Sequence, residues 1–190
     1  MTVWLLLFCT QAWMVALGNV SVHRRLGVLG VAAAAAVVLT ALFTTLGFVP
    51  RVLEAGGGSG AMPGIVVRDL LSLVVFAAFV GLAVHWRTRP AIHKRLMLLA
   101  SVVILGQAYF RQPAASLVQL IPDPLGLGLF LMGSLCFVIA LIGHDYLSDR
   151  RIHGVTTWAG ATVIALELSV KALVNSGAAE SMANWLSRPT

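Results

Sequence analysis

The sequence predicts an all-α membrane protein, a polytopic bundle of six transmembrane helices. Hydrophobic residues make up 59% of the 190 residues and charged residues only 11%, whereas soluble domains carry about 25% charged residues. The mean hydropathy is +0.93, and the apolar runs are too long to be strands. This composition excludes an ordinary water-soluble enzyme and a disordered chain.

Six segments are long and apolar enough to be considered as spans, which need about 20 residues each. The first is interpreted as a helix and not as a signal peptide, because it lacks a basic start and Gln11 interrupts its apolar core. Proline and the glycine run 56–60 separate the segments. The segments are 2–18, 26–48, 67–86, 95–112, 125–147 and 155–174. They form one domain, 1–174, followed by an external tail, 175–190, whose Trp185 is expected to lie at the membrane interface.

The loops between these segments alternate in charge. The formal net charge is +6, and eight of the basic residues fall in the first, third and fifth loops: Arg24, Arg25, Arg87, Arg89, Lys94, Arg95, Arg150 and Arg151. The positive-inside rule therefore places the odd loops in the cytoplasm and both termini outside. No basic stretch is long enough to follow a phosphate backbone, so a nucleic-acid partner is not expected.

An internal similarity supports three parallel helical-hairpin repeats. Residues 22–29 match residues 92–99, and residues 150–153 open the sixth segment in a looser version. Each unit is a helix, a basic loop with histidine, and a second helix. The alternative is that any helix beginning at a basic inner loop shows this pattern.

Histidines are the most informative side chains, because the even number of crossings between them brings all five to the cytoplasmic side. His85 and His144 are the best pair for the axial positions of a haem b, with His93 as a further cofactor ligand. His23, His153 and Asp145 are candidates for a shallow transition-metal site, in which the carboxylate binds the ion or orients His144. The structural alternative is that these residues anchor helix ends at the interface.

Two pairs of polar residues lie inside the apolar segments. Glu167 and Lys171 are four residues apart and can pair on one helix face. Gln107 and Arg111 have the same spacing near the outer end of the fourth segment. Ionisable groups in a bilayer are functional candidates, and these four would line an outer polar cavity; a structural ion pair is the alternative.

Several short motifs resemble a family of uncharacterised multi-pass bacterial inner-membrane proteins that carry a domain of unknown function. They are Trp4–Phe8 with Gln11 and His23–Gly27, His93-x-Arg95–Ala100 with Arg111, and His144-Asp145 with Arg150-Arg151-x-His153. Loosely similar families include small b-type cytochrome bundles and assembly proteins of haem-copper oxidases. The resemblance implies the bacterial inner membrane as location and no established activity.

The sequence therefore favours a haem- or metal-binding membrane protein with a redox or oxidase-assembly role. A small transporter and a non-catalytic accessory subunit are the alternatives. Enzymatic activity stays undecided and is disfavoured, because no catalytic triad, carboxylate pair or nucleotide motif is present. The expected partners are the lipid bilayer and either another membrane protein or further copies of the chain.

Overall fold

The structure is a computed structural model that describes residues 2–54, 61–105 and 129–186. The described residues are all-helical and contain no strand, which confirms the all-α class. The helices are α1 (Thr2–Ala16), α2 (Val20–Glu54), α3 (Ala61–His85), α4 (Pro90–Leu105), α6 (Leu129–Asp149), α7 (Gly154–Asn175) and α8 (Ala178–Leu186).

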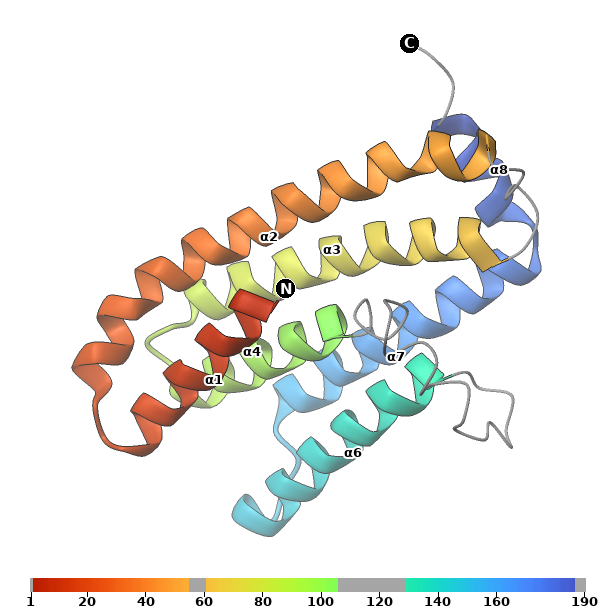
Figure 1. Cartoon of the computed structure of the whole chain (residues 1–190). Helices are drawn as coiled ribbons and strands as arrows, with labels where there is room; N and C mark the ends of the chain where they lie inside the picture. The colour runs from red at the N-terminus through yellow and green to blue at the C-terminus, as the bar shows by residue number, and fades with distance from the viewer. Residues whose placement is uncertain (1, 55–60, 106–128, 187–190) are drawn as a thin grey trace.

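Three antiparallel hairpins dominate the arrangement: α1 with α2, α3 with α4, and α6 with α7. Their tight turns all lie at one end of the bundle, at the left and lower left of Figure 1. We call this the turn end. The C-terminal ends of α2 and α7, the start of α3 and the short helix α8 lie at the opposite end, which we call the distal end.

Local sequence explains where the hairpins turn. Gly18 adopts a positive φ of 78° between α1 and α2, a conformation that glycine adopts without steric cost. Pro90 begins α4, where its missing N–H has no helical partner to lose. Arg150, with φ of 54°, ends α6, and His153 caps the N-terminus of α7 by accepting a hydrogen bond from the backbone N–H of Val155.

The core lies where α3, α4 and α7 meet. Phe76, Leu96, Leu99 and Val163 are buried there. Helix α1 joins this core through Trp4, whose ring packs edge-to-face on Phe76 at a centroid distance of 5.1 Å. The same indole donates a hydrogen bond to Ser101 Oγ at 3.3 Å, so its polar atom is satisfied inside the bundle.

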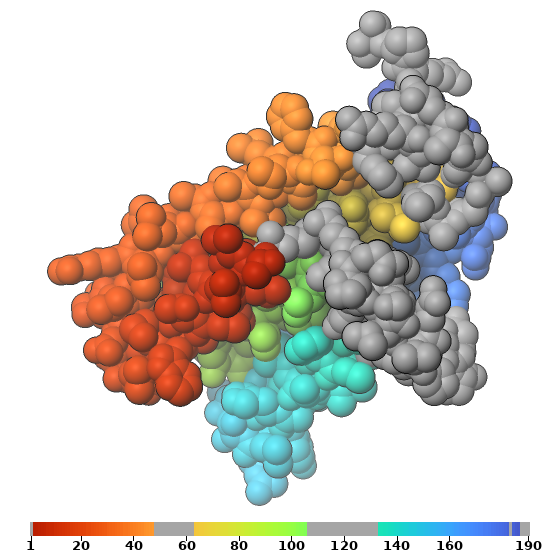
Figure 2. Space-filling view, in the orientation of Figure 1, coloured from red at the N-terminus to blue at the C-terminus, as the bar shows by residue number. Residues whose placement is uncertain are grey.

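The outer surface is apolar. On α2, side chains as large as Phe43, Leu39 and Val28 face outward, and Figure 2 shows α2 and α6 forming two margins of the molecule. Three described helices are long and apolar enough to cross a membrane: 20–47, 63–85 and 154–175. Because exposed apolar surface of this extent is costly in water, the chain has the character of a membrane protein.

The predicted segments and the helices differ mainly at their ends. Helix α2 continues to Glu54, through Pro50, six residues beyond the expected end at residue 48. The fixed φ of proline is compatible with a helix, although its ring removes one backbone hydrogen bond. The expected tail contains a helix of its own, α8, which packs against α3 and α7 and buries Ala179.

Candidate functional site

All five histidines belong to helix ends at the turn end of the bundle. His23 and His93 are the fourth residues of α2 and α4, and His85 is the last residue of α3. His144 lies in the last two turns of α6, and His153 precedes α7. Their grouping at one end follows from the hairpin arrangement (Figure 1).

The imidazole rings of His23 and His93 lie next to each other at the turn end. Their ring centroids are 6.2 Å apart and the ring planes cross at 76°. His93 Nδ1 lies 2.8 Å from the carbonyl oxygen of Ala83. Since a carbonyl only accepts, Nδ1 carries the proton and the lone pair of His93 is on Nε2. His23 Nδ1 is buried and has no hydrogen-bond partner among the residues that the structure describes.

The predicted haem pair, His85 and His144, is not supported by the geometry. Both side chains are exposed, His144 to 57%. They belong to α3 and α6, which do not form one of the main helix contacts among the described residues. His85 instead packs edge-to-face against its neighbour Trp86, at a centroid distance of 5.6 Å. The sequence predicts that both residues lie on the same side as the other histidines, and in the structure they lie at the turn end. The direction in which each helix turns its side chain does not follow from the sequence.

Asp145 and His153, two of the predicted shallow-metal ligands, form hydrogen bonds within the bundle. The Asp145 carboxylate accepts hydrogen bonds from Arg95, from Thr156 Oγ1 at 2.5 Å and from the backbone N–H of His153 at 3.1 Å. Its distance of 3.7 Å to His144 Nδ1 is too long for the expected orienting hydrogen bond. His153 Nδ1 is occupied as the cap of α7.

Arg95 is therefore the centre of a buried network that joins all three helices of this region. Its guanidinium contacts Asp145 on α6 and Thr156 on α7, and it also donates to the carbonyl of Ala91 at 2.7 Å. Relative exposure of the side chain is 2% for Arg95 and 0% for Asp145. Every donor around this carboxylate favours its ionised form.

A second buried ion pair lies toward the distal end. Arg68 on α3 donates to Glu167 Oε1 on α7 at 2.6 Å, and Ser134 Oγ on α6 lies 3.4 Å from the same oxygen. The sequence predicts Lys171 as the partner of Glu167. In the structure Glu167 forms an ion pair with Arg68, and Lys171 is exposed. The other expected polar pair, Gln107 and Arg111, lies outside the described residues.

Sequence reasoning missed Arg68, Arg95, Thr156 and Ser134. The two arginines were assigned to loops or loop flanks, although each falls just inside a predicted span. The signal that could have found them is the pair of carboxylates, Asp145 and Glu167, since a buried carboxylate requires a partner.

The described residues contain no group of three or more histidine, cysteine, aspartate or glutamate side chains that could hold a metal ion. Cys9 and Cys136 are both exposed on the apolar surface and unbonded to one another. The family models, the curated proteins and the solved structures compared with this chain include no match.

Proposed function

We propose that the chain is a multi-pass membrane protein that binds one transition-metal ion at its turn end through His23 and His93. The observation that carries this proposal is the approach of the two rings to 6.2 Å. With metal–nitrogen bonds of about 2.0–2.1 Å, the centroids of two imidazoles on one ion lie about 5–6.5 Å apart. The observed separation falls within that interval.

The hydrogen bond of His93 supports a ligand role. Ligating histidines usually donate their second ring nitrogen to a carbonyl or carboxylate, which fixes the tautomer. His93 does so to Ala83 O, and its Nε2 lone pair is then available. Imidazole binds copper, zinc, iron and nickel. Two nitrogen ligands suit Cu(I) best, because this ion accepts a coordination number of two.

The proposed setting is a bundle of three parallel hairpins in which all six long helices cross the bilayer. The three basic turns share one end, which favours the cytoplasmic side for the metal site. A role in redox chemistry or in the assembly of a haem-copper oxidase would be consistent with a cytoplasmic-side copper site.

A titration of the detergent-purified protein with Cu(I), under anaerobic conditions and against a coloured chelator, tests the proposal. We expect one ion per chain and X-ray absorption spectra with nitrogen ligands only. His23→Ala and His93→Ala should each weaken binding at least tenfold. His85→Ala and His144→Ala are matched controls at the same end of the bundle and should leave it unchanged.

Three results would overturn the proposal. The first is the absence of Cu(I) binding by protein that remains folded. The second is binding that survives both His23→Ala and His93→Ala. The third is a Soret band in the isolated protein that either substitution abolishes, since the two rings would then bind haem and not an ion.

A further inference from the structure

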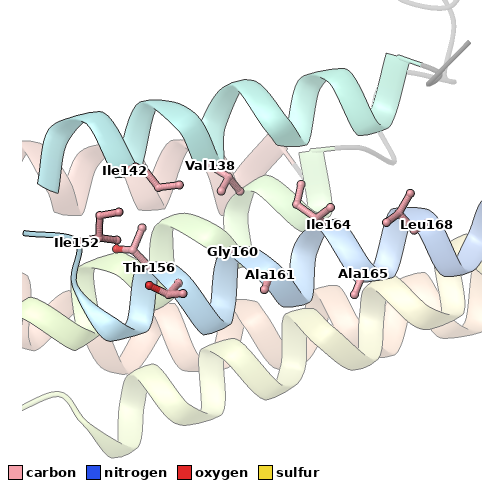
Figure 3. A pocket seen from close by; sticks show the side chains of 10 residues that line it. Val138, Ile142, Ile152, Thr156, Gly160, Ala161, Ile164, Ala165 and Leu168 are labelled. Atoms are coloured by element: carbon pink, nitrogen blue, oxygen red, sulfur yellow. The ribbon is translucent and has the colours of Figure 1, made fainter. Parts of the chain in front are cut away.

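An apolar groove runs along the outer face of the α6–α7 hairpin (Figure 3). It has a volume of about 410 Å³. Val138 and Ile142 of α6 form one wall, and α7 with Ile152 forms the other. Gly160 lets α6 pack closely on α7 beneath the groove, and the exposed small side chains of Ala161 and Ala165 keep the groove open.

The length and the position of the groove suit a lipid acyl chain. From Ile152 to Leu168 it follows sixteen residues of helix-end and helix, which is about 24 Å at 1.5 Å per residue. One leaflet of the hydrocarbon core is about 15 Å thick. One leaflet therefore covers about the first ten residues of the groove from Ile152, and an acyl chain that enters there can lie in this turn-end part of the groove.

Charge at the entrance specifies the headgroup. Arg150 and Arg151 directly precede Ile152, which forms the turn end of the groove, and both are exposed. Arg150 has a positive φ of 54° in the turn between α6 and α7. Guanidinium groups bind phosphate oxygens in a two-pronged geometry. Asp149 is exposed beside them and 3.9 Å from Arg95, so the local charge remains positive.

We infer that this hairpin holds one anionic phospholipid, with the phosphate on Arg150 and Arg151 and one acyl chain in the groove. The inference depends on insertion in a bilayer but not on metal binding by His23 and His93. Lipid binding would be a role of the α6–α7 hairpin in addition to its buried hydrogen bonds with Arg95.

Lipid binding to the delipidated protein in detergent can be measured by native mass spectrometry and by thermal shift. We expect phosphatidylglycerol to bind and to raise the Tm, and phosphatidylcholine with the same acyl chains to bind at least tenfold more weakly. Arg150→Gln with Arg151→Gln should remove this preference. Arg87→Gln with Arg89→Gln, an equal loss of charge at another turn, should preserve it.

The groove itself is tested by Ala161→Phe, which should reduce phosphatidylglycerol binding at least fivefold. Ala140→Phe adds the same bulk to an exposed position of α6 outside the groove and should not reduce it. Inorganic phosphate and glycerol phosphate should produce no shift, because they lack an acyl chain. Equal binding of the two lipids, equal effects of the two arginine pairs, or unchanged binding in Ala161→Phe would each overturn the inference.

Discussion

Arg95 and Asp145 form an ion pair that joins the second and third hairpins, with neither side chain open to its surroundings. The pair lies 50 positions apart in sequence and also bonds Thr156 at the start of α7. A single arginine thereby fixes how α4, α6 and α7 meet at the turn end. The pair lies near the proposed metal site, since His93 lies two residues before Arg95 on the same helix.

Removal of the Asp145 charge should strongly destabilise the fold. Asp145→Asn leaves the guanidinium of Arg95 buried without its counter-charge, and loss of one partner of a buried pair costs about 3–5 kcal/mol. We expect a markedly lower Tm in detergent. Asp149→Asn is the control, because Asp149 is 58% exposed and 3.9 Å from Arg95, and an exposed pair contributes about 0–1 kcal/mol. Equal effects of the two substitutions would contradict the assigned role.

Access of water to the second ion pair, Arg68 and Glu167, distinguishes a sealed bundle from a transporter. Ser72 is 1% exposed, and its Oγ has no hydrogen-bond partner among the described side chains and backbone; Ser134 is buried beside Glu167. In a background without Cys9 and Cys136, we expect Ser72→Cys and Ser134→Cys to react slowly with a water-soluble thiol reagent. Ser148→Cys, at an exposed position, should react fast.

Fast labelling of the two buried positions would indicate a water-filled path to Arg68 and Glu167, as a transporter requires. The described residues between the two ion pairs favour the sealed state. Helix α7 carries Thr156 and Glu167 eleven residues apart, but the buried Val163 and Ala159 lie between them. Buried apolar side chains of this kind separate the two polar layers.

The hairpins could be predicted from sequence, whereas the pairs of side chains that interact between different hairpins could not. Basic turns, Gly18 and Pro90 mark hairpin boundaries locally, and the alternating charge predicts that the turns share one side of the membrane. Which face of a helix points inward depends on its rotation against neighbours that are distant in sequence. For that reason the pattern on α7 predicts Lys171 as a partner of Glu167 but cannot predict Arg68 on α3, with which Glu167 forms an ion pair.

For the histidines, too, the rings that come together belong to different hairpins and were not the pair that the sequence predicts. The pair that lies together, His23 and His93, occupies equal positions in the two segments that resemble one another, 22–29 and 92–99. The sequence predicts His85 and His144 as the haem pair. In the structure the first-turn positions are half-buried between hairpins, while His85 and His144 face outward.

Close packing of α6 on α7 should make Gly160 intolerant of a side chain. A Cβ at Gly160 would lie 3.0 Å from Val138 Cγ1, and valine has little freedom at χ1 to move away. Overpacking of this kind costs about 1–3 kcal/mol, so Gly160→Ala should lower the Tm. Gly81→Ala, where a Cβ meets nothing within 4 Å, should not. Val138→Ala should restore part of the loss in Gly160→Ala; a loss of equal size with either residue at 138 would exclude the contact as its cause.

The orientation of the bundle can be tested at two exposed turn positions. Thr88 lies between α3 and α4 at the turn end, and Ser176 follows α7 at the distal end. In the cysteine-free background, we expect a membrane-impermeant thiol reagent to label Ser176→Cys in intact cells. Thr88→Cys should be labelled only after the membrane is opened, because the positive-inside rule predicts that the turn with Arg87 and Arg89 lies on the cytoplasmic side. The reverse pattern would place the basic turns outside. Labelling of both positions in intact cells would show that the chain between Thr88 and Ser176, which includes α4, α6 and α7, crosses the bilayer an even number of times.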